Sequence, residues 1–320
     1  MTPTRIFIHD QLPPQHSMLD EVWAGLSRPQ KELAPKFFYD ARGCELFAAI
    51  CGLPEYYPTR AELAIMQKHA RAMAGAAGPD CALIEIGCGN SAKTRALLTE
   101  LRPRAFMAVD IAREQLETSC QALAREFPAM RIVALRADFA QAIELPAAEL
   151  PGARRVLYFP GSTIGNFTPF EARAFLARWA PLLGPGGGAL VGVDLKKNPA
   201  VLNAAYNDAQ GVTAEFNLNV LRHINRELGA DFDLAAFRHQ ARYDAAHGRI
   251  EMHLESLKPQ RVKLADRTLL FRAGETIHTE NSYKYAIDEF QDLARAAGYQ
   301  PQQCWTDDAR LFAVHYLTLP

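Results

Sequence analysis

The chain of 320 residues has the length of about two domains and can bury a core without disulfides or metals. With 49% hydrophobic and 22% charged residues, it is not a disordered protein, a fibrous protein or a disulfide-scaffolded mini-protein. Its 35 Lys and Arg residues nearly balance its 36 Asp and Glu residues, which gives a formal net charge of -1. The sequence therefore has no basic excess of the kind that nucleic-acid binding requires. A basic patch that forms only in the folded protein would not show in this count.

The six cysteines lack the spacing of a zinc site or a redox pair, and none of the nine His residues has metal-like partners. We therefore expect reduced thiols in a cytoplasmic protein and no metal centre. The N-terminus lacks the features of a signal peptide, and no apolar run reaches the ~18 residues of a membrane span, so no membrane association is expected. The cysteines are Cys44, Cys51, Cys81, Cys88, Cys120 and Cys304.

Residues 61–196 alternate between short apolar runs and helical stretches. A first helix is predicted to start at Pro58, with Thr59 as its cap and Glu62 three residues later, and to run through Met73. The near-continuous apolar runs that follow indicate a parallel sheet covered by helices on both faces. The predicted strands are 82–86, 105–109, 131–135, 154–159 and 189–194, and the predicted helices are 91–101, 112–127 and 169–183.

After Asp194 this alternation ends. Residues 197–228 look helical, and 237–285 read as alternating strands of a mixed or antiparallel unit. A last helix at 287–297, closed by Gly298, is followed by strands near 303–305 and 311–317. We expect a sheet domain made of 61–196 plus 286–320, and a second α+β domain made of 1–60 plus 197–285, inserted into the first and joined by the N-terminus.

A glycine-containing loop, Gly87-Cys88-Gly89-Asn90-Ser91-Ala92-Lys93-Thr94, joins strand 82–86 to the next helix. Glycine permits a tight turn, and the helix N-terminus favours an anionic or polar ligand. A dinucleotide would fit because Asp110 follows at the distance of a ribose-binding acid. A nucleoside triphosphate would use Lys93-Thr94 with Asp194 as a metal-binding acid. The third candidate is S-adenosylmethionine.

Three features favour S-adenosylmethionine and leave the other two ligands open. Glu85 lies in the strand just before the loop, where an acid suits a cationic amino group. Ala92 stands where a triphosphate loop has glycine. Asp138-Phe139 follows the third strand and offers an acceptor and a ring to an adenosine. The competing interpretation is that Asp110 and Asp138 only cap turns.

Longer motifs elsewhere resemble the histidine-specific, S-adenosylmethionine-dependent methyltransferases of ergothioneine biosynthesis. The resemblance covers residues 35 to 317 and is far more specific than the glycine loop. The motifs lie at 35–43 (PKFFYDARG), 53–62 (LPEYYPTRAE), 84–89 (IEIGCG), 159–166 (FPGSTIGN), 206–217 (YNDAQGVTAEFN) and 279–285 (TENSYKY).

The resemblance implies a class I methyltransferase fold, which is Rossmann-like α/β with a seven-stranded sheet, and a separate domain that binds substrate. It implies an enzyme that trimethylates the α-amino nitrogen of L-histidine to hercynine with S-adenosylmethionine as methyl donor. It further implies a monomer whose partner is a small molecule.

The resemblance also assigns residues. Tyr39, Gly161 and Asn166 would lie at the reacting nitrogen, and Glu280 and Ser282, on one face of a strand, would bind the two imidazole nitrogens. The cofactor residues would be Gly87, Gly89, Lys93, Asp110, Asp138 and Phe139, and the histidine residues Tyr56, Asn166, Tyr206, Glu280 and Ser282. Met252, on a strand that we expect to lie beside that of Glu280 and Ser282, is a further candidate for the wall of the histidine pocket.

Each assignment has an ordinary structural alternative. Tyr56 and Tyr206 could pack a domain interface, and Glu280 and Ser282 could face solvent on an edge strand. Asn166 could cap the next helix, with Thr168 as competitor. At the level of function, the acceptor could be another amino acid or aromatic amine, or the chain could be a non-catalytic S-adenosylmethionine-binding or P-loop regulatory protein.

Overall fold

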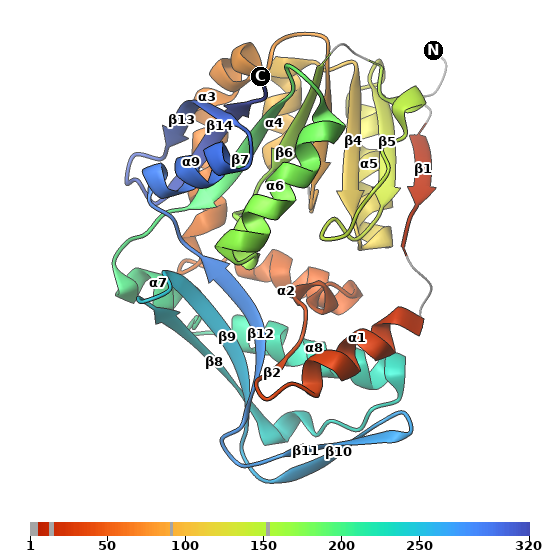
Figure 1. The fold of residues 1–320 in the computed structure, drawn as a ribbon, viewed down its shortest axis with the longest axis vertical. Helices are drawn as coiled ribbons and strands as arrows, with labels where there is room; N and C mark the ends of the chain where they lie inside the picture. Colours follow the sequence, from red (N-terminus) through yellow and green to blue (C-terminus); the bar gives the residue numbers. More distant parts are fainter. Residues whose placement is uncertain (1–5, 13–15, 90–91, 152–153) are drawn as a thin grey trace. The chain divides into compact units, whose positions relative to one another are not determined.

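The structure is a computed structural model that describes residues 6–12, 16–89, 92–151 and 154–320 (Figure 1). The chain divides into two units, which are described separately. The sheet unit is Met1–Leu12, Pro58–Lys196 and Tyr283–Pro320, and the insert unit is Pro13–Tyr57 and Lys197–Ser282.

The sheet unit is built on eight strands in the order β1-β5-β4-β3-β6-β7-β14-β13. All neighbours from β1 to β7 pair in parallel, and β14 is antiparallel to both β7 and β13. Seven of these strands form the Rossmann-like sheet that the resemblance implies, so the predicted fold class is confirmed. The strands are β1 (Ile6–Asp10), β3 (Cys81–Ile86), β4 (Ala105–Asp110), β5 (Arg131–Arg136), β6 (Arg154–Phe159), β7 (Gly188–Asp194), β13 (Gln300–Thr306) and β14 (Phe312–Thr318).

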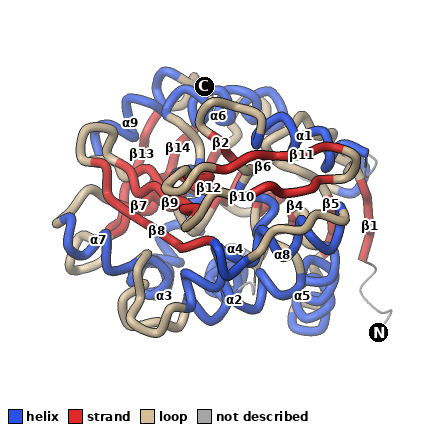
Figure 2. Tube along the Cα trace, turned by 90° about the horizontal axis from the view of Figure 1, so that it is seen from below, coloured by secondary structure: helices blue, strands red, loops and turns tan. Residues whose placement is uncertain are grey.

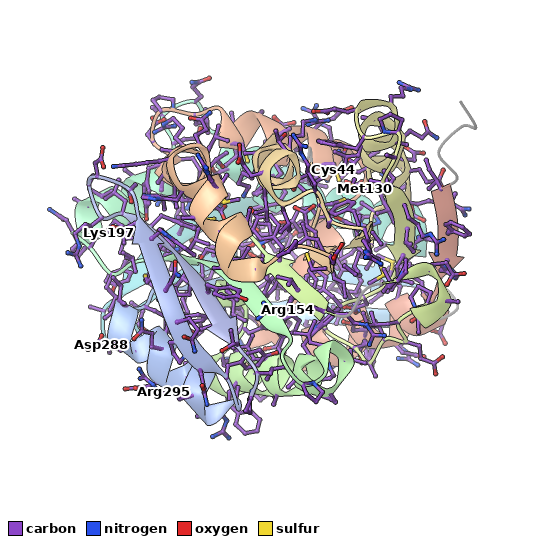
Figure 3. All side chains as sticks on the ribbon, turned by 90° about the horizontal axis from the view of Figure 1, so that it is seen from above. Cys44, Met130, Arg154, Lys197, Asp288 and Arg295 are labelled. Atoms are coloured by element: carbon purple, nitrogen blue, oxygen red, sulfur yellow. The ribbon has the colours of Figure 1, made fainter. Side chains whose placement is uncertain are left out.

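Helices cover both faces of this sheet, as Figure 1 shows. The apolar core on one face comes from α3, α4 and α5, and the core on the other face comes from α6 and α9. Asp288 and Arg295, labelled in Figure 3, are exposed on α9, whereas Phe290 and Ala294 of the same helix are buried. The helices are α3 (Tyr57–Ala77), α4 (Ala92–Leu101), α5 (Arg113–Glu126), α6 (Pro169–Leu183) and α9 (Ile287–Ala296), with short 3-10 turns at η2 (Ala147–Glu149) and η3 (Thr163–Asn166).

The strand order reverses at β3. The chain continues from β3 to β4 and β5 on one side, and β6 and β7 lie on the other side. Parallel α/β sheets bind ligands beside the carboxyl ends of their strands at such a reversal. The topology therefore directs attention to the loops that follow β3, β4, β5 and β6.

Two sequence-based expectations were wrong. The sequence analysis placed all of residues 1–60 in one domain with 197–285, but residues 6–10 form the edge strand β1 of the sheet unit. This strand is short and half-exposed, so its sequence pattern gave little signal. Helix α3 begins at Tyr57, so Thr59 lies inside it and caps nothing. The boundaries between the units fall near 58 and 283, within three residues of the predicted 61 and 286. Ser91, the predicted start of the next helix, lies outside the described residues.

The insert unit packs helices against a four-stranded sheet of order β2-β12-β9-β8. Helix α8 buries Phe216, Val220 and Ile224, and Phe216 stacks on Phe38 with ring centroids 4.6 Å apart. Figure 2 shows β10 and β11 side by side as a separate antiparallel hairpin. The elements are α1 (His16–Leu26), β2 (Lys31–Glu32), η1 (Pro35–Phe38), α2 (Ala41–Cys51), α7 (Pro199–Ala205), α8 (Val212–Leu228), η4 (Leu234–Ala236), β8 (Phe237–Asp244), β9 (Arg249–Ser256), β10 (Gln260–Leu264), β11 (Arg267–Phe271) and β12 (Thr276–Tyr283).

A buried ion pair fixes the segment that follows β12. Lys284 Nζ lies 2.8 Å from Asp194 Oδ2, and neither side chain is exposed beyond 1%. Backbone bonds from Tyr285 to Asp194 and from Lys196 to Tyr285 hold the same segment against the end of β7. Removing one partner of such a pair typically costs about 3–5 kcal/mol, because the other charge stays buried.

None of the helices in the described ranges is long and apolar enough to cross a membrane.

Candidate functional site

The loop after β3 owes its glycines to backbone conformation. Gly87 has φ +71° and Gly89 has φ +45°, a region that residues with a Cβ enter only at a cost. A Cβ at either position would meet no described atom within 4 Å, so crowding does not explain them. Gln115 and Ser119 of α5 anchor the loop by donating to the Gly89 carbonyl at 2.8 and 2.6 Å. The Gly89 carbonyl is thus held in place, and no side chain at Gly87 or Gly89 blocks a close approach to the backbone.

Glu85 is a buried carboxyl group just before this loop. It is 1% exposed, and Thr94 of α4 donates to its Oε1 at 2.5 Å. Its Oε2 is buried without a hydrogen-bond partner among the described residues. Burial raises the pKa of Glu85 to about 8, opposed by the Thr94 hydrogen bond and by the nearby Lys93 charge. A cation at Oε2 would give this buried oxygen a partner. Glu85 is therefore suited to bind a cofactor that carries an ammonium group.

Asp110 is the last residue of β4, and Asp138 lies two residues beyond the end of the neighbouring strand β5. Asp110 Oδ1 accepts from the Ala112 amide at 3.0 Å, and Asp138 Oδ1 accepts from the Ala140 amide at 3.0 Å. Both aspartates therefore cap turns, as the competing interpretation predicted. The Cys88 thiol also donates to the second oxygen of Asp110, Oδ2, at 3.9 Å. Burial raises the pKa of Asp110.

Phe139 follows Asp138 and packs edge-on against three aromatic rings. Its ring centroid lies 5.8 Å from that of Phe159, and 6.5 Å from those of Phe167 and Phe175. The ring is only partly buried. It is held rigidly by its neighbours and keeps an open part, as a wall for a flat base would require.

Lys93 extends from the start of α4 to a carboxylate that sequence reasoning missed. Its Nζ lies 2.5 Å from Glu62 Oε2, and the Glu62 side chain is fully buried. Both Glu62 oxygens also accept from the Gly161 amide, at 3.1 and 2.9 Å. The sequence analysis took Glu62 for part of a capping box, because a Thr and a Glu three residues apart are typical of a helix start. The structure places it in the second turn of α3 instead.

The loop after β6 is held in a costly backbone conformation. Gly161 has φ +76° and Ser162, which is not a glycine, has φ +56°. Ser162 Oγ accepts from the Asp194 amide at 2.9 Å, and the Gly165 amide donates to the Ser162 carbonyl at 2.8 Å. Gly165 must be glycine because a Cβ there would lie 2.7 Å from the Tyr283 carbonyl oxygen.

Asn166 closes η3 in this loop. It does not cap the next helix, because Thr168 caps α6 and forms a reciprocal capping box with Glu171. The structural alternative for Asn166 is therefore excluded.

The insert unit gathers most of the predicted histidine residues into one cluster. The Tyr206 hydroxyl donates to Ser282 Oγ at 2.8 Å, and the rings of Tyr206 and Tyr56 meet edge-on with centroids 6.1 Å apart. Burial raises the pKa of Tyr56 well above its usual value, and the nearby Tyr206, Cys51, Glu280 and Tyr39 raise it further. Tyr39, Tyr56, Tyr206, Glu280 and Ser282 thus come together, which sequence spacing alone could not show.

Met252 lies in β9, which pairs with the strand that carries Glu280 and Ser282, as the sequence analysis expected. It is 1% exposed, and its carbonyl accepts from Thr279 Oγ1 at 3.1 Å. It belongs to the buried body of the same sheet.

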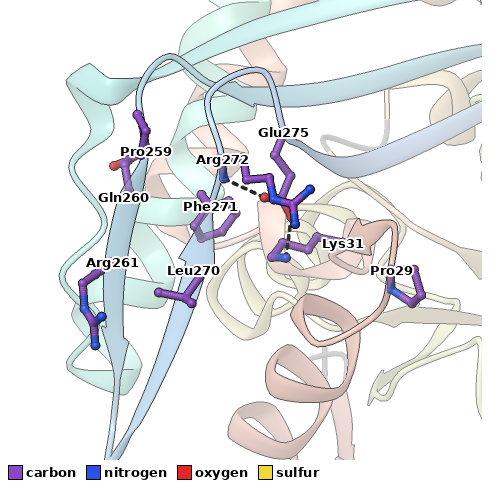
Figure 4. Close-up of a pocket in the computed structure, with 9 residues that line it drawn as sticks. All are labelled: Pro29, Lys31, Pro259, Gln260, Arg261, Leu270, Phe271, Arg272 and Glu275. Atoms are coloured by element: carbon purple, nitrogen blue, oxygen red, sulfur yellow. Dashed lines mark hydrogen bonds and ion pairs between the residues drawn. The ribbon is translucent and has the colours of Figure 1, made fainter.

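A hollow in the insert unit lies at the β10–β11 hairpin and contains none of the predicted residues (Figure 4). Lys31 and the Arg272 amide converge there on Glu275, at 2.6 and 2.7 Å. The Lys31 ammonium in this hollow is therefore already paired with the Glu275 carboxylate. Among the described residues no group of three His, Cys, Asp or Glu side chains is arranged to hold a metal ion.

Comparison with known proteins identifies the family. The family model for histidine-specific, S-adenosylmethionine-dependent methyltransferases matches residues 18–319. The chain belongs to this family. It is 44% identical over 301 residues to the histidine N-alpha-methyltransferase of Mycobacterium tuberculosis, covering 92% of each chain.

Two further proteins are more distant. The chain is 32% identical to ergothioneine biosynthesis protein 1 of Neurospora crassa, over 86% of this chain and 32% of that one. The solved structure of the CcbJ methyltransferase from Streptomyces caelestis has a TM-score of 0.48 and 15% identity, covering 80% of this chain and 96% of that one.

Membership of this family decides among the three ligands predicted for the glycine loop. The family is described as dependent on S-adenosylmethionine, so the dinucleotide and triphosphate interpretations are wrong. The structure gives a physical reason against the triphosphate, because Asp194, its proposed metal ligand, is paired with Lys284. The roles of individual residues toward the ligands remain predictions.

The raised pKa of Glu85 makes a prediction about stability. Its folded-state pKa of about 8 lies above the ordinary 4.5, so the folded protein binds the extra proton between these values. This contribution is complete below pH 4.5 and is lost as pH rises through 8, at up to about 1.4 kcal/mol per pH unit. Urea unfolding of the ligand-free protein across this range should show a shallower fall for Glu85→Gln than for wild type. The exposed Glu100→Gln is the control, and equal slopes in wild type and Glu85→Gln would contradict the assignment.

Proposed function

We propose that this chain transfers three methyl groups from S-adenosylmethionine to the α-amino nitrogen of L-histidine and so produces hercynine, the first step of ergothioneine biosynthesis. The observation that carries this proposal is the cluster of Tyr56, Tyr206, Glu280 and Ser282 in the insert unit of a histidine-specific methyltransferase. The M. tuberculosis relative, which this chain covers almost completely, is named for the same activity.

The residues of the sheet unit fit the methyl donor. Glu85 would accept the ammonium of its methionine part at the orphaned Oε2. Asp110 Oδ2, which accepts only a long hydrogen bond from the Cys88 thiol, would accept from the ribose hydroxyls, and Asp138 with Phe139 would bind the adenine. Gly87 and Gly89 let the backbone approach closely, and Lys93 would pair with the carboxylate. S-adenosylmethionine supplies an electrophilic methyl group on a sulfonium.

The residues of the insert unit fit an imidazole. Glu280 would accept one ring N–H, and the Ser282 hydroxyl would bind the other nitrogen, oriented by the hydrogen bond it accepts from Tyr206. A site built from polar groups rejects apolar analogues, because its own groups would be left unpaired. Met252 would form part of the wall, and Tyr56, Tyr206 and Asn166 would bind the amino-acid end.

The α-amine must be neutral to donate its lone pair. Removal from water and a neighbouring sulfonium both disfavour the ammonium form, so no strong base is needed. Tyr39, partly buried beside Phe47 and Phe216, would pass the proton to water. The main contribution of the protein is then to hold the nitrogen in line with the methyl group, with Gly161 and Asn166 beside the reacting atoms.

We further infer a monomeric cytoplasmic enzyme. All six cysteines are free thiols, which suits a reducing compartment.

The product of the reaction tests this function. Purified enzyme is incubated with S-adenosylmethionine and each of a panel of amino acids, and the products are read by mass spectrometry. Histidine should gain one, two and finally three methyl groups, and tandem spectra should place them on the α-nitrogen. Preferred methylation of another amino acid would support the alternative acceptor, and no transfer to any member would support a non-catalytic binding protein.

The imidazole assignment predicts a selective loss of affinity. Glu280→Gln should weaken histidine binding by roughly 10- to 100-fold, the value of a hydrogen bond to a charged group, and leave S-adenosylhomocysteine affinity nearly unchanged. Isothermal titration measures both. The matched control is Glu255→Gln, which removes an acid of the neighbouring strand β9 that pairs with Arg238 of β8. Unchanged histidine affinity in Glu280→Gln would refute the assignment.

A further inference from the structure

Glu62 connects three segments of the sheet unit at one buried point. Its carboxylate, 0% exposed, receives the Lys93 ammonium from α4 and the Gly161 amide from the loop after β6. These segments are far apart in sequence, since 31 residues separate Glu62 from Lys93 and 99 separate it from Gly161.

The surrounding backbone is shaped to admit this carboxylate. Gly192 lies in the middle of β7, between apolar residues. A Cβ at this position would overlap Glu62 Oε1. At Gly161 a Cβ would lie 3.7 Å from Lys93 Nζ and 3.3 Å from Thr163 Oγ1. Gly192 thus leaves the room that the Glu62 carboxylate occupies, whereas at Gly161 a Cβ would only touch Lys93 at an ordinary contact distance.

The exposure of the pair is asymmetric. The Glu62 side chain is fully buried, whereas that of Lys93 remains 21% exposed. An ammonium has three N–H donors, and Glu62 takes one of them. The buried Glu62 carboxylate therefore holds Lys93 in place, while the exposed part of the Lys93 side chain stays accessible to an anionic group.

We propose that Glu62 is a positioning residue of the methyl-donor site: its buried carboxylate fixes Lys93 and the Gly161 amide and thereby sets the affinity for the donor. This inference rests on the proposed function, because it assigns Lys93 to the carboxylate of S-adenosylmethionine. A lysine has a long flexible stem, and holding it in one conformation before binding removes an entropic cost from the binding step.

A purely structural role makes a different prediction. If Glu62 only stabilised the fold, its removal would lower the unfolding temperature and leave the folded protein with normal affinity for the donor. If Glu62 positions Lys93 and Gly161, affinity for the donor falls in protein that is still folded, and the KM for S-adenosylmethionine rises more than the KM for histidine.

Isothermal titration with S-adenosylhomocysteine tests the inference without requiring turnover. Glu62→Gln keeps the shape and an acceptor for Gly161 but removes the charge that holds Lys93, and its Kd should rise by at least ~10-fold. Glu62→Asp, which restores the charge one methylene further away, should recover part of the affinity. Glu126→Gln is the matched control, because it removes the exposed partner of Arg95 on the same helix as Lys93, and it should bind as wild type does.

The outcomes separate this inference from the proposed function. Wild-type affinity in folded Glu62→Gln would overturn the positioning role, whereas failure of the wild type to bind S-adenosylhomocysteine would overturn the proposed function itself. If Glu62→Gln does not fold, Gly192→Ala provides the second variant, because its methyl displaces the carboxylate without deleting it. That variant should also weaken binding, and unchanged affinity in it would contradict the inference.

Discussion

The structure depends on how it compensates charge that is buried near the carboxyl ends of the central strands. Glu62 and Asp194 each face an ammonium supplied by the chain itself, from Lys93 and Lys284. Glu85 has only the Thr94 hydroxyl, and its second oxygen has no partner among the described residues. A buried carboxyl group in this position either stays protonated or receives a cation from outside. The raised pKa of Glu85 corresponds to the protonated form in the absence of ligand. In the proposed donor site, the ammonium of the methyl donor would be the cation that Glu85 receives.

In the proposed function, the two units would use different chemistry for recognition. In the sheet unit, carboxylates and a lysine suit a zwitterionic methionine group and a ribose. In the insert unit, aromatic rings and hydroxyls surround one acid, Glu280, with Tyr206 and Ser282 already joined by a hydrogen bond. Such a cluster would suit a neutral, polar ring, because its acid and its hydroxyls can both bond to ring nitrogens. The difference follows from the ligands, one strongly charged and one nearly neutral at physiological pH.

Local patterns predicted the sheet well because its strands are almost entirely apolar and are separated by helices of regular period. They failed where a residue's role depends on distant partners. Glu62 looked like part of a helix cap, because nothing near it in sequence shows that Gly161 and Lys93 converge on it. Asp194 resembled a metal ligand until Lys284, 90 residues later, proved to neutralise it. The substrate residues came from long motifs, which named them without their geometry, and β1 was missed because its exposed edge carries no strong alternation.

The most direct test of this account is the proton balance of methyl-donor binding. S-adenosylhomocysteine keeps the ammonium of the donor, and an ammonium at Glu85 should drive off the proton that this residue carries below its pKa of about 8. Calorimetric titrations at neutral pH in buffers of different ionisation enthalpy measure protons exchanged per ligand bound. The account predicts release of close to one proton by the wild type and none attributable to this group in Glu85→Gln. Binding to the wild type without proton release would contradict it.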